Sequence, residues 1–212
     1  MAKTAPFDEN VDRYELWFER YPNAYQAELR AVAELLPKEG IGLDIGTGTG
    51  RFSSPIGISV GVEPSIVMAR VALTRNIDVV RGVAEDLPIK TEALDFVLMV
   101  TTVCFLDDVN LSFREAFMVL RQGGAFVTGF VDRLSPLGQS YLLHKNENVF
   151  YKSATFYTVK EIVNSLNEAG FKNFQYRQTI FKNLSETSPN EPVRQGYGDG
   201  AFVVVRAEKA KG

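Results

Sequence analysis

The sequence predicts an α/β fold in which helices cover both faces of a mostly parallel sheet. Three observations predict it. Short apolar runs, each about one strand long, alternate with amphipathic helical stretches along most of the chain. The first run leads into a glycine-rich turn, and a second apolar run follows that turn. The run over 93–100 is apolar at nearly every position, as expected of a central parallel strand buried on both faces.

Length and composition narrow the class of protein. The 212 residues fit one domain with a substantial core, and 45% hydrophobic with 23% charged residues is ordinary for a globular protein. The net charge of −3 and the absence of a Lys/Arg run argue against a nucleic-acid partner, so a small neutral or cationic substrate is expected. The oligomeric state stays open.

The cysteine content and the lengths of the apolar runs predict a cellular compartment. Cys104 is the one cysteine, so no internal disulfide can form, which indicates a reducing environment. No apolar run is long enough to cross a bilayer, and Met1 is not followed by an apolar signal segment. A cytoplasmic location without membrane attachment is therefore expected.

The stretch 40–64 organises the chain. An apolar run at 41–45 reads as a strand, and a second one at 58–62 ends at Glu63. Glycines alternate in the turn between them: Gly46, Gly48 and Gly50. Such spacing permits positive φ and lets a ligand lie against bare main chain. A carboxylate at the position of Glu63 is suited to bind ribose hydroxyls.

Charge decides which nucleoside ligand the turn favours. The dinucleotide pattern G-x-G-x-x-G is not met, because Arg51 follows Gly50 and no glycine comes at the required step. Asp44 lies directly before the turn, where it would repel a diphosphate. S-adenosylmethionine carries an ammonium and a sulfonium instead of phosphates. Acids at the ends of both strands therefore favour S-adenosylmethionine.

Five segments together resemble a known family. They are LDIGTGTGRF at 43–52, GVEPS at 61–65, GVAEDLP at 82–88, LDFVLMVTTVCFLDD at 94–108 and VLRQGGAFV at 119–127. In order and spacing these are similar to the motifs of class I S-adenosylmethionine-dependent methyltransferases, in particular the small-molecule branch. The resemblance implies a Rossmann-like methyltransferase fold over 1–212 as one domain, with a seven-stranded, mostly parallel sheet whose last strand is antiparallel.

The resemblance also implies the residues that bind S-adenosylmethionine: Asp44, Gly46, Thr47, Gly48, Gly50, Glu63, Pro64, Ala84, Glu85 and Thr101. In this interpretation the Ala84 amide meets an adenine ring nitrogen, and the Glu85 carboxylate accepts from the exocyclic amine. Asp86 is the alternative acceptor. Main chain at Val100 and Thr101 is expected to face the methionine part.

The N-terminal 1–36 reads as helical and aromatic. Tyr14 and Trp17 belong to a stripe of aromatic residues at helical spacing, which Pro22 interrupts. The stripe either packs on the sheet or forms a mobile lid over the cofactor. In the lid interpretation, Arg13 and Tyr14 are the residues that would touch the methionine end.

The elements between 51 and 88 follow from local signals. Pro55 and Gly57 shorten the helix expected after the glycine turn to one or two turns. Ser65 is a suitable N-cap for a helix over 66–75, and 77–81 reads as the third strand.

The second half continues the alternation. Asp107 or Asp108 can begin a helix, for which Gly123 or Gly124 is the expected end. A strand over 125–131 follows. Thr158 and Glu161 form a capping box that opens a helix ending at Gly170. The last two strands are expected at 171–181 and 201–207.

Residues 132–157 depart from the alternation of strands and helices, and they are predicted to form a cap over the substrate side of the site. They contain His144, the weak candidate for a general base, for which a surface position is the alternative. Aromatic residues at 14, 17, 141 and 151 could surround a cationic amine, or could simply pack the lid. Cys104 is expected to be inert packing, and no spacing of residues suggests a metal site.

The function these observations favour is methyl transfer from S-adenosylmethionine to a small molecule, with an amine as the suggested acceptor. The reaction is an in-line displacement that needs positioning more than a catalytic dyad. Two alternatives share parts of the pattern: an NAD(P)-binding oxidoreductase, and a non-catalytic cofactor-binding subunit of a larger assembly.

Overall fold

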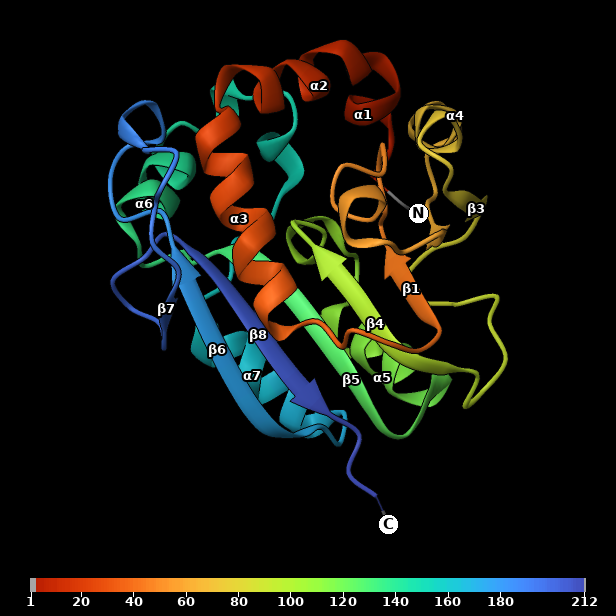
Figure 1. Cartoon of the computed structure of the whole chain (residues 1–212). Coiled ribbons are helices and arrows are strands. Elements are labelled where there is room, and N and C mark those ends of the chain that lie inside the picture. Colours follow the sequence, from red (N-terminus) through yellow and green to blue (C-terminus); the bar gives the residue numbers. More distant parts are fainter. Residues whose placement is uncertain (1–2, 212) are drawn as a thin grey trace.

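The computed structural model describes residues 3–211, and within them eight strands form one sheet in the order β3-β2-β1-β4-β5-β8-β6-β7 (Figure 1). The five strands from β3 to β5 are parallel, and β8 runs antiparallel to both of its neighbours. The α/β class and the antiparallel last strand are thus confirmed. The strands are β1 Gly42–Ile45, β2 Val60–Val62, β3 Asp78–Val80, β4 Leu94–Val100, β5 Leu120–Val131, β6 Lys172–Thr179, β7 Arg194–Gln195 and β8 Phe202–Glu208.

The prediction of seven strands is wrong by one. The eighth is β7, a pair of residues from the turn-rich loop that joins β6 to β8. It pairs antiparallel with Arg177 and Gln178 of β6. Two glycines at positive φ, Gly196 and Gly198, turn the chain immediately after it. The loop folds back on the sheet because its main chain gains partners at the open edge of β6.

Helices lie on both faces of the sheet. In Figure 1, α3 crosses the near face over β5, β8 and β6, while α5 and α7 lie behind. The helices are α1 Ala5–Glu9, α2 Val11–Arg20, α3 Pro22–Leu35, α4 Ile66–Thr74, α5 Val109–Val119, α6 Pro136–Leu143 and α7 Val159–Glu168. Short 3-10 segments lie at Ser54–Ile56, Val103–Phe105, Lys145–Glu147, Tyr151–Ser153 and Leu184–Glu186.

Strand β4 divides the core into two layers. Val97 and Met99 face the α5 and α7 side, whereas Phe96, Leu98 and Val100 face α3. The alternation follows from the two-residue period of a strand, and each of these side chains is buried. Apolar residues at successive positions are therefore required, as expected for a central strand.

Three local predictions are confirmed. The Ser65 side chain caps α4 by accepting a hydrogen bond from the Met68 amide at 3.1 Å. Thr158 and Glu161 form the reciprocal capping box at the start of α7. After the glycine turn the helix is reduced to a 3-10 segment at Ser54–Ile56. Each feature depends on residues a few positions apart, which is why the sequence predicts it.

The predicted end of α5 is wrong. The helix ends at Val119, before both glycines, and Leu120 already has extended main chain and pairs with Leu94 of β4. Gly123 has φ +80°, and its amide donates to the Lys209 carbonyl at 2.7 Å. The glycines shape an irregular start of β5 and not a helix cap, since the chain needs them to turn within the strand.

The N-terminal helices lie across the carboxyl ends of the central strands. Figure 1 shows α1 and α2 running along the top of the molecule, above the tips of β1 and β4. Helix α2 ends at Arg20, and Pro22 begins α3, so the predicted break at Pro22 is confirmed. This arrangement closes the sheet edge where ligands bind in open α/β folds.

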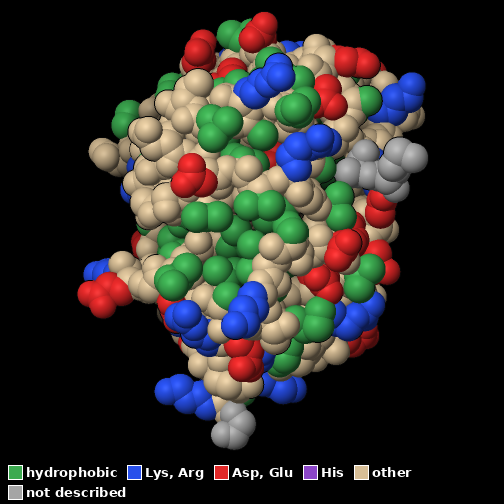
Figure 2. All heavy atoms as spheres, turned by 90° about the vertical axis from the view of Figure 1, so that its right-hand side faces the viewer, with side chains coloured by type: hydrophobic (Ala, Val, Ile, Leu, Met, Phe, Trp, Pro, Cys, Tyr) green, Lys and Arg blue, Asp and Glu red, His purple; other side chains and the backbone are tan. Residues whose placement is uncertain are grey.

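One face of the molecule is partly apolar. Figure 2 shows hydrophobic side chains gathered at the centre of the face where β3 ends the sheet, with charged side chains around them. Exposed apolar residues of the neighbouring elements include Leu73 of α4 and Val80 of β3.

Candidate active site

The glycine turn after β1 forms the floor of the site. Gly46, Gly48 and Gly50 all have positive φ, between +56° and +80°. The amides of Gly46 and Thr47 donate to the Val62 carbonyl at 2.8 and 3.2 Å, so the turn folds back onto β2. A Cβ added at Gly46 would lie 2.4 Å from the Thr102 side chain, which leaves room for glycine alone.

Glu63 ends β2 and lies against the turn. It is 7% exposed; Oε2 accepts a hydrogen bond from the Gly48 amide at 2.9 Å, and Oε1 accepts one from the Ser65 amide at 2.8 Å. Burial raises the pKa of this carboxyl, while the two amides act to lower it. These two bonds from main-chain amides fix the carboxylate beside the turn.

Asp44 lies behind the turn. Its Oδ2 accepts hydrogen bonds from the Thr47 and Ser53 hydroxyls. Its Oδ1 is buried and has no hydrogen-bond partner among the described residues. Burial raises the pKa of Asp44 to about 7, although the two hydroxyls lower it. The side chain therefore holds the turn in shape from within the protein.

Two cavities open at the carboxyl ends of the strands. The first cavity has a volume of about 110 Å³ and is lined by several of the predicted cofactor residues: Gly46, Gly48, Glu63, Pro64, Ala84, Glu85 and Thr101. The structure thus brings these seven together. Asp44, Thr47 and Gly50 do not line either cavity.

Glu85 already has partners in the first cavity. Its Oε1 accepts hydrogen bonds from the amides of Asp107 and Asp108, at 2.8 and 3.3 Å. These bonds join the 82–88 loop to the start of α5. Glu85 thus lies on the wall of the first cavity with one carboxylate oxygen held by these amides.

Thr101 has strained main chain at the end of β4. Its φ is +52°, unusual for a β-branched residue, and its amide donates to the Gly129 carbonyl at 2.7 Å. Thr101 lines both cavities. Strain of this kind is often found at functional sites, and the sequence gives no signal for it.

The second cavity is larger, at about 440 Å³. Four residues line both cavities and form the junction between them: Phe7, Tyr14, Thr101 and Phe105. The cap contributes aromatic side chains, among them Tyr141 and Tyr151, whose rings lie 4.7 Å apart. Of the aromatic residues named from the sequence, Tyr14, Trp17, Tyr141 and Tyr151 all line the second cavity. Arg13 lines it as well, but does not line the first.

Sequence reasoning missed Glu28. It lies on the face of α3 that packs on the sheet, is 3% exposed, and lines the second cavity. Burial raises its pKa to about 8. The signal was present, because Glu28 falls between Ala24, Ala27 and Ala31 on the apolar stripe of the helix. A carboxylate is rarely buried so completely unless it is paired.

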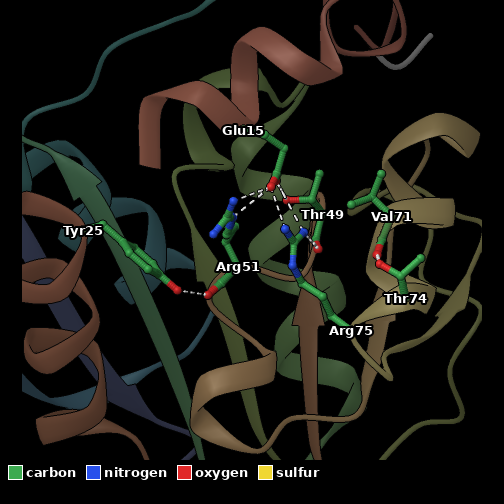
Figure 3. Close-up of polar contacts among 7 residues, drawn as sticks. All are labelled: Glu15, Tyr25, Thr49, Arg51, Val71, Thr74 and Arg75. Carbon is green, nitrogen blue, oxygen red and sulfur yellow. Dashed lines mark hydrogen bonds and ion pairs between the residues drawn. The ribbon is translucent and has the colours of Figure 1, made fainter. Parts of the chain in front are cut away.

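Glu15 fastens α2 to the glycine turn. Figure 3 shows its carboxylate between Arg51, Arg75 and Thr49. The Thr49 hydroxyl donates to Oε1, and guanidinium nitrogens of Arg51 and Arg75 each lie 2.5 Å from Oε2. Burial acts to raise the pKa of Glu15, but the hydrogen bonds from Arg51 and Arg75 outweigh it and hold the pKa below its usual value.

A second contact connects α3 to the residue that follows the glycine turn. The Tyr25 hydroxyl donates to the Arg51 carbonyl at 2.5 Å (Figure 3). The Tyr14 hydroxyl lies over the turn, since a Cβ on Gly48 would lie 3.3 Å from it. The N-terminal helices therefore contact the part of the site where the methionine end of the cofactor is predicted.

His144 is at neither cavity. It is exposed at the end of α6, and its Nδ1 lies 3.0 Å from the Ser140 carbonyl oxygen. Cys104 lines the second cavity, and burial raises the pKa of its thiol to about 12, which favours the inert thiol. Within residues 3–211, no three His, Cys, Asp or Glu side chains lie together in a group able to hold a metal ion.

Comparison with known proteins identifies the class. A family model described as "Methyltransferase domain" matches residues 43–128. A SAM-dependent methyltransferase of Thermotoga maritima, described as a possible histamine N-methyltransferase, has a TM-score of 0.95 and 48% identity, covering 97% of this chain and 99% of that one. The chain belongs to the class I S-adenosylmethionine-dependent methyltransferases, and S-adenosylmethionine is its cofactor.

Two further proteins are similar to the chain in sequence or in fold. An uncharacterized protein of Methanocaldococcus jannaschii is 42% identical over 96% of this chain and 98% of its own length. A phosphoethanolamine N-methyltransferase of Haemonchus contortus, solved with S-adenosylhomocysteine, shares the fold, with a TM-score of 0.64 and 16% identity over 88% of this chain and 53% of that one. These matches give the NAD(P) oxidoreductase alternative no support. None of the helices in residues 3–211 is both long and apolar enough to cross a bilayer.

Proposed function

We propose that this methyltransferase transfers its methyl group to a small amine bound in the second cavity. The observation that carries the proposal is the wall of that cavity, which combines aromatic rings from α2 and the cap with one buried acid, Glu28. Aromatic faces and a carboxylate both attract a cation. The description of the Thermotoga maritima protein as a possible histamine N-methyltransferase supports the same class of acceptor.

The cofactor roles of individual residues form part of the proposal. The fit of the site to S-adenosylmethionine rests on Glu63, whose carboxylate is held by hydrogen bonds beside the bare main chain of Gly46 and Gly48. In this assignment Glu63 binds the ribose, Pro64, Ala84 and Glu85 surround the adenine, and Thr101 faces the methionine end. The other three predicted cofactor residues line neither cavity, and in this assignment they hold the turn in shape: Asp44, Thr47 and Gly50.

Bound S-adenosylmethionine supplies an electrophilic methyl group whose transfer leaves a neutral thioether. The protein therefore needs to hold the acceptor nitrogen in line and to exclude water. Phe7, Tyr14 and Phe105 surround the junction with aromatic side chains, so they are suited to both tasks. Burial, and then the charge of Glu63, raises the pKa of the Tyr14 hydroxyl, which keeps it protonated as a hydrogen-bond donor.

The lid interpretation of α1 and α2 belongs to this proposal. At about 110 Å³ the first cavity is smaller than the roughly 300 Å³ typical of small-molecule sites. Phe7 and Tyr14 form part of its wall, and both come from the N-terminal helices. Entry of a whole nucleoside with its methionine therefore requires these helices to move outward.

A homocysteine-release assay tests the acceptor class. The protein is supplied with S-adenosylmethionine and a coupled hydrolase, and is offered aromatic and aliphatic amines beside phenols and carboxylates of matched size. Amines are expected to stimulate release, and mass spectrometry should show an N-methyl product. Release driven by phenols or carboxylates, with amines inactive, would overturn the amine proposal and leave the methyltransferase assignment intact.

A further inference from the structure

Glu28 is a buried acid without a protein partner. Within residues 3–211 no group donates a hydrogen bond to its carboxylate and no cation lies within ion-pair distance, although the residue is only 3% exposed. Its side chain lines the second cavity. A buried carboxylate without a partner is costly, and the protein therefore gains from it only if something else pairs with it.

The surroundings of Glu28 define what could pair with it. Its charge acts on Tyr141 and Tyr151 of the cap, since it contributes to the raised pKa of both hydroxyls after the larger effect of burial. Trp17 and Tyr21 of the N-terminal region line the same cavity. A carboxylate among aromatic rings is a site for an ammonium or another cationic nitrogen.

The cations of the cavity are not placed to neutralise Glu28. Arg13 and Arg20 also line the second cavity, but both side chains are exposed at its edge, and neither forms an ion pair with Glu28. The cavity thus has positive charge at its mouth and, in its interior, an acid that burial keeps protonated until a cation pairs with it. A ligand with a positive nitrogen at its inner end stabilises the ionised form of this acid.

Glu28 lies apart from the place where methyl transfer is expected. The junction of the two cavities is lined by Phe7, Tyr14, Thr101 and Phe105, and Glu28 lines the second cavity alone. Resting on the proposed function, we propose that Glu28 binds a cationic nitrogen of the acceptor that is not the methylated atom. The acceptor then has two functional ends: a nucleophilic nitrogen at the junction and a cation against Glu28. Glu28 is in this role a positioning and specificity residue, and it transfers no proton to or from the reacting atom.

Binding experiments test this directly. Protein saturated with S-adenosylhomocysteine is titrated calorimetrically with histamine, tryptamine and 2-phenylethylamine, and with the alcohols in which hydroxyl replaces the amino group. The titrations are repeated without S-adenosylhomocysteine. The variants are Glu28→Gln, which keeps the shape and removes the charge, and Glu19→Gln, a matched control at an exposed position of α2.

At least one amine is expected to bind the wild-type protein and Glu19→Gln roughly tenfold to a hundredfold more tightly than its alcohol. Glu28→Gln should lose that preference while binding S-adenosylhomocysteine unchanged. In turnover with histamine, which has a second nucleophilic nitrogen in its ring, Glu28→Gln should raise KM with a smaller effect on kcat, and the product should carry its methyl group on a ring nitrogen.

Three results would overturn the inference: no amine preference in the wild-type protein, an unchanged preference in Glu28→Gln, or methylation at the nitrogen that Glu28 binds. A purely structural Glu28 would instead lower the melting temperature on substitution without changing the choice between amine and alcohol. Absence of S-adenosylhomocysteine binding in the wild-type protein would count against the proposed function, and the titrations without it would still test Glu28.

Discussion

Glu15 of α2 forms an ion pair with Arg51 of the glycine turn, with 2.5 Å between the carboxylate and guanidinium atoms. The same oxygen lies 2.5 Å from Arg75, which follows α4. One acid therefore connects α2 both to the residue after the glycine turn and to the residue after α4. Any movement of α2 away from the cofactor site must break this cluster.

The substitution Glu15→Gln tests the cluster. It keeps the length of the side chain, but leaves Arg51 and Arg75 close together without a balancing charge. We expect a loss of roughly 1–3 kcal/mol in the free energy of unfolding, because the pairs are partly buried. Amide hydrogen exchange over 11–20 should become faster, and so should release of S-adenosylhomocysteine.

The control for this experiment is Glu19→Gln, which changes an exposed acid on the same helix. It should leave exchange and release unchanged. If Glu15→Gln also leaves exchange over 11–20 at the wild-type rate, then α2 is not held by this cluster and the lid interpretation loses its support.

Glu63→Ala should weaken binding of S-adenosylhomocysteine by roughly 1–3 kcal/mol through the lost ribose bonds. Part of the loss will come from the turn, because the substitution also removes the acceptor for the Gly48 and Ser65 amides. Isothermal titration measures the change. Glu39→Ala, at an exposed position before β1, serves as the control. Unchanged affinity would show that Glu63 is not a ribose ligand.

Buried acids predict how stability depends on pH. Burial raises the pKa of Glu28 to about 8 and that of Asp44 to about 7. At pH values between the ordinary pKa values of these two groups and the raised ones, the folded protein therefore binds more protons than the unfolded chain. Stability from both groups is therefore highest at low pH and falls as the pH rises from about 4 to about 8. Urea unfolding at several pH values measures this fall.

Glu28→Gln should flatten that dependence. Because the variant has no carboxyl to ionise at this position, it should be more stable than the wild-type protein at pH values above 8, by a few kcal/mol. The two proteins should differ least at pH 5. A variant that is equally destabilised at every pH would contradict an unpaired, buried carboxyl.

Cys104 should be unreactive and dispensable for methyl transfer. With its pKa raised to about 12 by burial, its thiolate at pH 8 is on the order of a thousandfold scarcer than that of a free cysteine. Alkylation by iodoacetamide should be correspondingly slow until the protein is unfolded. Cys104→Ala should retain methyl transfer, whereas rapid labelling of the folded protein would show an accessible thiolate.

The sequence predicts what depends on near neighbours. The strands around the glycine turn, the Ser65 cap and the capping box of Thr158 each follow from residues within a few positions. The end of α5 is predicted wrongly because it depends on residues that are distant in the chain. Gly123 and Gly124 have the composition of a helix stop, but β5 pairs with β4 from Leu120 onward, and that pairing depends on distant chain.

The site itself depends on distant residues, which limits prediction from one sequence. Glu15, Arg51 and Arg75 are unremarkable charges on their own elements, and only the fold brings them together. The second cavity likewise joins α2 and α3 to the cap, more than a hundred residues later. The burial of Glu28 could be predicted from its position on the apolar face of its helix. The cavity that Glu28 lines could not be predicted from the sequence.

The central claim is that Glu63 at the end of β2, beside a turn of bare main chain, suits an adenosyl cofactor without phosphates. Parallel calorimetric titrations of the wild-type protein with S-adenosylhomocysteine and with NAD test this most directly. The structure predicts saturable binding of S-adenosylhomocysteine at micromolar concentrations and no heat from NAD at millimolar concentrations. Saturable binding of NAD, with S-adenosylhomocysteine inert, would contradict it.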